Sequence, residues 1–369
     1  MPVLVDRGSD PRIANAAGDC IEIGLVNNMP DAALEATERQ FVSLIEAGAQ
    51  DLRVRLRLFS LPGVPRGERG QRHLDASYRG LDELRDSRLD ALIVTGTEPR
   101  AAALPDEPYW RPLAELIDWA ERHTISTVWS CLAAHAAVLH LDGIARRPLA
   151  EKCFGVFDCT AAVDHPLIAG ARRLAVPHSR WNELREDELA ARGYDVLTRS
   201  AQAGVDAFAR QGRSLFVFFQ GHPEYDAASL LGEYRRDFGR YLRRERDTCP
   251  ALPHGYFDAV TAAELGLLRA RALVDRREDL LAAFPLAAAE RGLRAGWRAP
   301  AERLYRNGLI QVATRKARRL ESPAVAVLPA PRPAAARLAA RTPFVERRRR
   351  NDPSGFYAGE RDRRMSAQS

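Results

Sequence analysis

The sequence predicts an α/β protein in which a mostly parallel sheet carries helices on both of its faces. The main observation is that short, apolar, strand-like segments alternate with amphipathic, helix-like segments four times before residue 140. After about residue 255 the pattern becomes helical, which predicts helical additions at the C-terminal side. The 369 residues are 46% hydrophobic and 28% charged, so wholesale disorder, a collagen-like fibre and a disulfide scaffold are excluded.

The first half of the chain shows the alternation most clearly. Residues 1–18 are small, polar and without a period, which predicts a flexible N-terminal arm. Residues 66–80 are rich in glycine and arginine, so we expect an exposed connection there. Around these segments the pattern predicts strands at 20–26, 54–61, 89–94 and 124–130, and helices at 31–49, 110–123 and from 132 onwards.

The second half predicts more strands, then helices and finally a tail. Apolar runs indicate strands at 174–176, 195–198, 207–209 and 214–219, and the later pattern indicates helices at 261–274 and 276–284. From about residue 315 the chain is basic and, further on, rich in alanine, proline and arginine, which cannot build a core. We therefore expect one folded domain over residues 19–314 and a disordered basic tail over 315–369.

Charge and cysteine content limit the classes of partner. The net charge is +6, but residues 315–369 alone carry +9, which leaves −3 for residues 1–314. We therefore do not expect the folded part to bind nucleic acid, and the role of the tail is left open.

The absence of a long apolar run and of a secretion signal predicts a cytoplasmic protein without a membrane partner. Five loosely spaced cysteines, without a C-x-x-C pair, predict no metal site.

Cys131 is the first candidate for chemistry, because it follows the predicted strand 124–130 and precedes helix-forming residues. A thiol at the turn from a strand into a helix lies at the helix N-terminus, where the dipole and free N–H groups favour a thiolate and an oxyanion. Parallel sheets place reactive groups at such strand ends. The competing interpretation is a small apolar core cysteine, which is our expectation for the remaining four cysteines, Cys20, Cys153, Cys159 and Cys249.

His222 and Glu224 are the second candidate, directly after the phenylalanine-rich strand 214–219. They are two residues apart with Pro223 between them, so one group can act as a base while the other fixes its tautomer. Taken alone, a glutamate beside a satisfied histidine is a common structural feature. Together with Cys131 at another strand end, the pair predicts a catalytic site.

Cys131, followed about 90 residues later by His-Pro-Glu, has the order of the class I glutamine amidotransferases, and the implied fold is flavodoxin-like. Over about residues 20–310 the chain more specifically resembles the homoserine O-acyltransferase (homoserine O-succinyltransferase) family. The matching strings include Ile23-Gly-Leu-Val-Asn-Asn-Met-Pro30, Ser126-Thr-Val-Trp-Ser-Cys131, Pro177-His-Ser-Arg180 and Gly221-His-Pro-Glu-Tyr-Asp226.

The resemblance implies a role for each matching residue. Cys131 corresponds to the acylated nucleophile, His222 to the general base and Glu224 to its partner. Three further residues correspond to substrate-binding positions: Lys152, Ser179 and Arg236. The backbone around four residues near the nucleophile is expected to stabilise the oxyanion: Thr95, Gly96, Thr97 and Leu132.

The implied activity is transfer of an acyl group from acyl-CoA to the homoserine hydroxyl, most simply succinyl transfer in methionine biosynthesis, through a thioester at Cys131. The substrates are then two small molecules and no bound cofactor is needed, while a homodimer is compatible with the resemblance. The acyltransferase domain is expected to span residues 19–314. Two alternatives stay open: a glutaminase-type amidotransferase or cysteine hydrolase with the same triad, and a non-catalytic binding protein on the same scaffold.

Three positions depart from the family pattern. Leu132 replaces an aromatic residue and His135 replaces a glutamine. Arg100 stands where the family usually has glycine for succinyl transfer or glutamate for acetyl transfer. Our hypothesis is that Arg100 pairs with the carboxylate of a dicarboxylic acyl donor; the alternative is that its side chain points into solvent.

Overall fold

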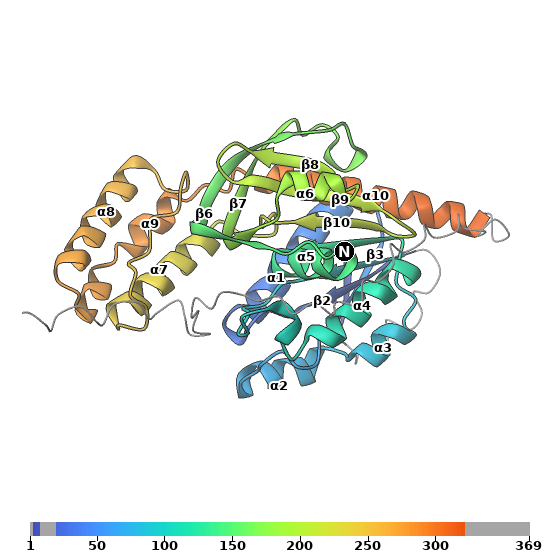
Figure 1. Ribbon diagram of the computed structural model, residues 1–369, viewed down its shortest axis with the longest axis horizontal. Coiled ribbons are helices and arrows are strands. Elements are labelled where there is room, and N and C mark those ends of the chain that lie inside the picture. Colours follow the sequence, from blue (N-terminus) through green and yellow to red (C-terminus); the bar gives the residue numbers. More distant parts are fainter. Residues whose placement is uncertain (1–2, 8–19, 322–369) are drawn as a thin grey trace, which may run out of the picture.

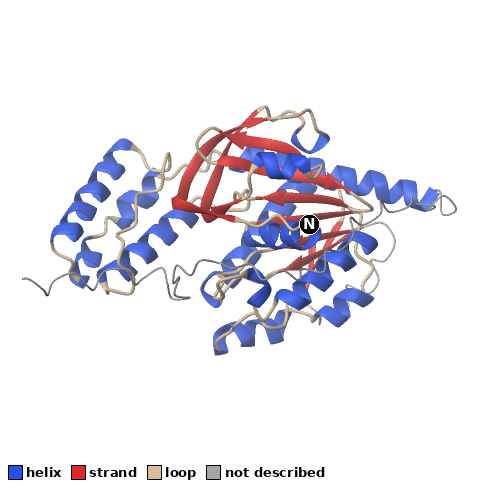
Figure 2. Cartoon of the chain, in the orientation of Figure 1, coloured by secondary structure: helices blue, strands red, loops and turns tan. Residues whose placement is uncertain are grey.

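The computed structural model describes residues 3–7 and 20–321, which form one ten-stranded sheet with helices on both faces (Figure 1, Figure 2). This confirms the predicted α/β class and the helical C-terminal additions. In spatial order the strands are β1 (Val3–Asp6), β3 (Val54–Phe59), β2 (Ile21–Val26), β4 (Ala91–Val94), β5 (Ser126–Ser130), β10 (Leu215–Phe219), β9 (Gly204–Gln211), β8 (Asp195–Ser200), β6 (Arg147–Ala161) and β7 (Arg173–Glu183).

The helices follow the strands in the alternating order that the sequence predicts. They are α1 (Asp31–Ala49), α2 (Glu68–Ser77), α3 (Leu81–Asp86), α4 (Trp110–His123), α5 (Leu132–Asp142), α6 (Glu186–Ala191), α7 (Ser229–Leu242), α8 (Ala259–Val274), α9 (Leu286–Gly292) and α10 (Arg298–Glu321). In the part of the chain that the structure describes, the remaining elements are three short 3-10 segments: η2 (Leu104–Asp106), η3 (Pro166–Ile168) and η4 (Glu278–Ala283). None of the helices in residues 3–7 and 20–321 is long and apolar enough to cross a membrane.

The sheet is parallel on one side and antiparallel on the other. Strands β1, β3, β2, β4, β5 and β10 all run parallel to their neighbours. Beyond β10 every pairing is antiparallel, through β9, β8, β6 and β7. The parallel part places the carboxyl ends of β4, β5 and β10 next to one another, which is where open α/β sheets carry their sites.

The two faces of the parallel part are covered by different helices. Helices α1 and α10 bury residues such as Phe41 and Leu309 against β2 and β3. Helices α4 and α5 pack with Trp129 of β5 and Phe218 of β10 in a second apolar cluster. Successive strand residues face opposite sides of a sheet, so neighbouring residues such as Leu25 and Val26 contribute to different clusters.

Helices α7, α8 and α9 form a third layer beside β6 and β7 at one end of the molecule (Figure 1). Their apolar cluster includes Phe154 of β6, Phe238 of α7 and Leu265 of α8. Trp297, which precedes α10, belongs to the same cluster and is almost fully buried. The C-terminal additions are therefore packed onto the edge of the sheet that lies next to the site.

Two predictions about the chain ends are wrong in part. Residues 3–6 form the edge strand β1, paired with β3, and Val3 and Asp6 are buried, so they are not a flexible arm. The predicted boundary at residue 314 falls inside α10, where Lys316 binds the backbone oxygen of Cys20 and the carboxylate of Asp90. Residues 1–2 and 8–18 of the predicted arm and residues 322–369 of the predicted tail lie outside the described residues.

Two internal elements also differ from the prediction. Residues 68–77, expected to be an exposed connection, form α2, in which Gly70 lies against Asp31 and the apolar side chain of Leu74 is buried. A single buried apolar side chain gives too weak a period to recognise a helix. The long strand β6 was not predicted, because only the second half of its sequence alternates between buried and exposed positions.

Candidate active site

Pairing of β5 with β10 brings the predicted nucleophile and base together. Ser130 and Phe219 are register partners at the ends of these parallel strands. Cys131 follows β5 directly, and its N–H donates a 2.7 Å hydrogen bond to the Phe219 carbonyl. His222 follows three residues after β10, and its N–H donates to the Pro177 carbonyl of β7 at 2.8 Å. The site is thus fixed by backbone hydrogen bonds on both sides.

Cys131 occupies a strained turn from β5 into α5. Its φ of 52° and ψ of −111° lie in a region that residues other than glycine rarely adopt. Such strain persists where the surrounding structure over-determines it, and it is typical of functional positions. Cys131 is the N-cap residue of α5, so its sulfur lies beside the free N–H groups of the first helical turn.

The loop after β4 approaches this turn closely. A Cβ at Gly96 would lie 2.9 Å from the Leu132 nitrogen and 2.9 Å from its Cβ, so only glycine allows this approach. The hydroxyl of Thr95 accepts the Asn28 N–H at 2.8 Å, which ties the loop to the end of β2. Leu132 is buried, while Thr97 is partly exposed. Of the four residues predicted to form the oxyanion region, Gly96 and Leu132 are therefore in direct contact beside Cys131, while the role of the region stays a prediction.

His222 and Glu224 form a buried ion pair. The ring Nδ1 lies 2.8 Å from Glu224 Oε1, and the Ser130 hydroxyl donates to the same oxygen at 3.3 Å. Burial disfavours the imidazolium, but the nearby Glu224 carboxylate and Cys131 sulfur outweigh it and hold the pKa of His222 well above its ordinary value. With Nδ1 held by glutamate, Nε2 is the nitrogen left to exchange a proton with Cys131 or a substrate.

Tyr225 connects this pair to a carboxylate that the sequence did not single out. Its ring stacks on the His222 imidazole with centroids 4.3 Å apart, and its hydroxyl donates to Glu233 Oε1 at 2.7 Å. The Ser179 hydroxyl donates to Glu233 Oε2 at 2.5 Å, and Lys152 Nζ lies 3.2 Å from the same oxygen. Burial opposes ionisation, but Lys152 and these hydrogen bonds hold the pKa of Glu233 below its usual value.

The three predicted substrate-binding residues therefore meet at helix α7. Lys152 also contacts Asp237 at 3.5 Å and lies 4.0 Å from the centre of the Phe154 ring. Arg236 pairs with Asp237 at 3.0 Å, and about half of its side chain remains exposed. Sequence reasoning missed Glu233 and Asp237, although both lie within three residues of the predicted Arg236.

The region around Arg100 contains a second positive group. The Arg100 side chain is exposed, whereas its backbone N–H and that of Ala101 donate to the buried carboxylate of Glu107. Arg146, which the sequence did not single out, is only partly exposed and has neither a hydrogen-bond nor an ion-pair partner among residues 3–7 and 20–321. Burial lowers the pKa of Arg146, and the neighbouring Tyr109, Cys131 and Glu107 oppose this effect.

His135, one of the departures from the family pattern, is a structural residue. It is buried, and its Nε2 lies 3.0 Å from the Gln220 amide oxygen. The same amide group binds backbone atoms of Leu184 and Val205. Burial lowers the pKa of His135 to about 3, so the ring is neutral and serves as a hydrogen-bond partner for the residue at the end of β10.

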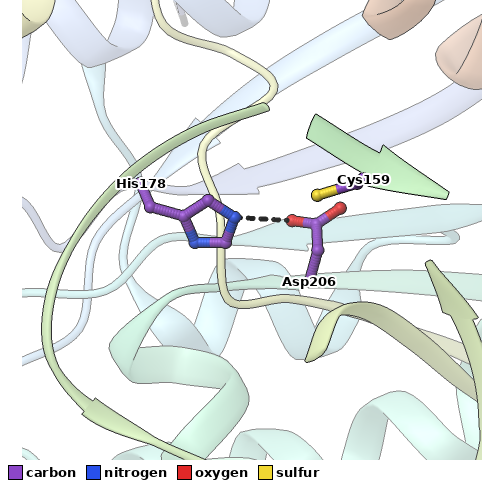
Figure 3. Close-up of side chains that lie close together, drawn as sticks. All are labelled: Cys159, His178 and Asp206. Atoms are coloured by element: carbon purple, nitrogen blue, oxygen red, sulfur yellow. Dashed lines mark ion pairs between the residues drawn. The ribbon is translucent and has the colours of Figure 1, made fainter. Parts of the chain in front are cut away.

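One buried cluster has residue types that bind metals: Cys159, His178 and Asp206 (Figure 3). Their ligand atoms lie within 4.8 Å of one another, and His178 Nε2 is 3.4 Å from Asp206 Oδ1. Arg180 Nε donates to His178 Nδ1 at 3.3 Å, so the ring hydrogen resides on Nε2. A protonated nitrogen that faces the carboxylate has no lone pair for a cation, and the residues present do not fit a metal site.

A cysteine at a strand–helix turn, beside a His–Glu pair in the loop after the neighbouring strand, is an arrangement typical of covalent nucleophilic catalysis. A sequence profile described as Homoserine O-succinyltransferase matches residues 9–317. The chain is 53% identical over 314 residues to homoserine O-succinyltransferase of Rhodopseudomonas palustris, covering 85% of this chain and 94% of that one. For the enzyme of Methylorubrum extorquens the identity is 51% over 298 residues, covering 80% and 88%. The chain belongs to the homoserine O-succinyltransferase family of acyltransferases.

Solved structures to which the chain is similar include two glutamine amidotransferases. The protein from Thermotoga maritima matches with a TM-score of 0.43 and 14% identity, covering 81% of this chain and 98% of that one. The protein from Methylobacillus flagellatus matches with a TM-score of 0.45 and 14% identity, covering 79% and 95%.

The ion pair at His222 gives a testable pH effect. Glu224 stabilises the imidazolium, so Glu224→Gln is expected to lower the pKa of the His222 ring by about one unit or more, as followed by NMR titration of the ring Cε1–H signal. Asp226→Asn is the matched control, because Asp226 is an exposed carboxylate in the same loop. An unchanged His222 pKa in Glu224→Gln would mean that the pair does not control the ring.

Proposed function

We propose that this chain transfers a succinyl group from succinyl-CoA to the hydroxyl of homoserine by double displacement at Cys131. The observation that supports this most is the strained Cys131 turn beside the buried His222–Glu224 pair, in a chain of this family. A glutaminase or a binding protein gains no comparable support, because the relatives reported above are named as transferases and the match covers most of their length.

The first half-reaction acylates the cysteine. The Cys131 thiolate attacks the thioester carbon, the carbonyl oxygen becomes an oxyanion, and the carbon–sulfur bond to CoA breaks. The imidazolium of His222 gives its proton to the departing CoA thiolate and becomes neutral. The oxyanion is proposed to be stabilised by the free N–H groups at the start of α5, beginning with Leu132, together with the backbone of Gly96 and Thr97. The close contact between Gly96 and Leu132 supports this assignment.

The second half-reaction uses the neutral ring as a base. His222 removes the proton of the homoserine hydroxyl while the oxygen attacks the acyl carbon, and the Cys131 thiolate leaves as the O-acyl ester forms. Glu224 stabilises the imidazolium that results. The atoms balance without an oxidant, a metal or a retained cofactor, with CoA acting only as the carrier of the acyl group.

The acceptor is proposed to bind beside helix α7. Arg236 has free donors for the homoserine carboxylate, since only part of its guanidinium is used by Asp237. Glu233 holds Lys152, Ser179 and Tyr225 in one arrangement. Because Tyr225 stacks on His222, the same network fixes the acceptor side relative to the base.

The covalent step is tested by intact-protein mass spectrometry after incubation with succinyl-CoA. We expect the mass to increase by one succinyl group in the natural protein and in Cys20→Ala, and to stay unchanged in Cys131→Ala. Addition of homoserine should then remove the adduct. An adduct that survives Cys131→Ala, or that glutamine forms in place of the CoA ester, would contradict the proposal.

Donor choice is proposed to depend on Arg100 and Arg146, whose side chains have no hydrogen-bond or ion-pair partner among the described residues. Arg146 interacts electrostatically with Cys131 and Glu107, and Glu107 accepts the backbone N–H of Arg100. Loss of a charged hydrogen bond to the succinyl carboxylate is expected to slow acylation by succinyl-CoA about tenfold or more relative to acetyl-CoA. The variants are Arg100→Glu and Arg146→Gln, measured as acylation rates with both donors.

Arg147→Gln is the matched control for this measurement, because Arg147 is exposed and pairs with Glu188. An equal loss with both donors would mean that the altered arginine acts on CoA or on the thiolate. If neither variant changes the succinyl-to-acetyl ratio, the donor carboxylate is bound elsewhere.

The remaining assignments are also proposals. The catalytic unit is proposed to be residues 19–314 together with β1 and the end of α10, and the protein is proposed to act in the cytoplasm. The tail is not needed for catalysis in this proposal, so a chain that ends at residue 321 should keep its activity.

A homodimer is supported by Val260, Leu267 and Val274 of α8, which are 70%, 69% and 90% exposed and lie on one helix face. Leu267→Glu should then yield monomers in analytical ultracentrifugation, and a monomeric natural protein would contradict the dimer.

A further inference from the structure

A buried polar cluster lies directly behind the segment that carries His222. Asp206 Oδ2 accepts the Thr198 hydroxyl at 2.8 Å, and Oδ1 lies 3.4 Å from His178 Nε2 (Figure 3). The Gln220 N–H donates to the Asp206 backbone carbonyl at 2.7 Å, and the Asp206 carboxylate lies directly against Gly221. Asp206 therefore contacts both residues that lie between β10 and His222, Gln220 and Gly221.

Gly221 shows how tightly this cluster fits the segment. A Cβ at that position would lie 2.5 Å from Asp206 Oδ1, 2.6 Å from Val176 Cγ1 and 3.0 Å from His178 Nε2. There is no room for a side chain between the carboxylate and the chain next to His222. The position of Asp206 thus limits how closely Gly221 can approach β9. It thereby also affects the position of the His222 imidazole.

Arg180 fixes the orientation of the His178 ring beside the Asp206 carboxylate. Arg180 donates to His178 Nδ1 and also binds the backbone oxygens of Asn182 and Ala203, which fixes its own side chain. The Nε2–H of His178 consequently faces Asp206 Oδ1. Burial lowers the pKa of His178 well below its ordinary value, so the ring is neutral and Asp206 supplies the negative charge. His178 Nε2 and Asp206 Oδ1 lie 3.4 Å apart, and neither atom has a hydrogen-bond partner among the described residues.

We propose that His178 and Asp206 are positioning residues for the reaction proposed above, holding Gly221 and His222 in place and stabilising the His222 imidazolium through the charge of Asp206. The inference rests on the proposed function, because it assigns a purpose to this cluster only if His222 is the base. It explains why a buried carboxylate, an arginine and a neutral histidine are assembled where a plain apolar core would otherwise suffice.

Several charged or titratable groups act on the ring from different elements. Glu224 comes from the same loop and Cys131 from the turn after β5, whereas His178 belongs to β7 and Asp206 to β9. Burial raises the pKa of Asp206 to about 6, and Arg180 and His222 partly oppose this. Removal of the Asp206 charge makes the imidazolium less stable, so the pKa of His222 falls and the neutral base persists to lower pH.

The experiment isolates the second half-reaction. The protein is acylated with succinyl-CoA, freed of CoA, and mixed with homoserine across a range of pH while loss of the adduct is followed by mass spectrometry. In Asp206→Asn we expect the acid limb of the rate profile to move to lower pH and the plateau rate to fall about 10- to 100-fold, with the homoserine KM unchanged. Cys159→Ala, in the same cluster but without a bond to the segment, should keep the natural profile.

Three results would overturn the inference: an acid limb at the natural pH in Asp206→Asn, an equal shift in Cys159→Ala, or zinc bound in equal amount to the purified protein. If Asp206→Asn does not fold, Thr198→Val removes one donor to the carboxylate and should shift the limb in the same direction by less; an unshifted limb there also contradicts the inference. Failure of the natural protein to form any adduct is a different outcome, which refutes the proposed function itself.

Discussion

The parallel pairing of β5 with β10 is the constraint on which the rest of the site depends. Its register sets Ser130 against Phe219, so Cys131, the residue that follows β5, donates to the last carbonyl of β10, and the chain then turns into α5. A shift of the pairing by one residue would send every side chain of β5 to the opposite face. The hydrogen bonds between β5 and β10 therefore determine both the burial of the Trp129 side chain and the position of the Cys131 turn.

The antiparallel half of the sheet and the C-terminal helices complete the site. The backbone carbonyls of Asp206 in β9 and Pro177 in β7 accept hydrogen bonds from the segment after β10, from the N–H groups of Gln220 and His222. From the other side, the Trp297 indole donates to the Tyr225 carbonyl at 2.8 Å, and Glu233 of α7 accepts the Tyr225 hydroxyl. The helical additions therefore act on the residue that stacks on the base, even though they lie beside the sheet.

Local patterns predicted the strand ends and their reactive residues, but not the groups that hold them. Cys131 and His222 follow buried strands within three residues, so local hydrophobicity was enough to find them. The partners of Glu233 lie 81 and 54 residues away in Lys152 and Ser179, and no local period records such a contact. Strand β1 and helix α2 escaped prediction for the related reason that each buries too few apolar side chains to give a period.

The two lysines of this arginine-rich chain illustrate how a site selects its side chains. The sequence has 55 Lys+Arg, yet lysine occurs only at 152 and 316. At 152 the ammonium contacts Glu233, Asp237 and the face of Phe154; at 316 it binds a backbone oxygen and Asp90, both at 2.7 Å. Both positions place a compact ammonium charge between two or more acceptors. One of them belongs to the proposed acceptor site.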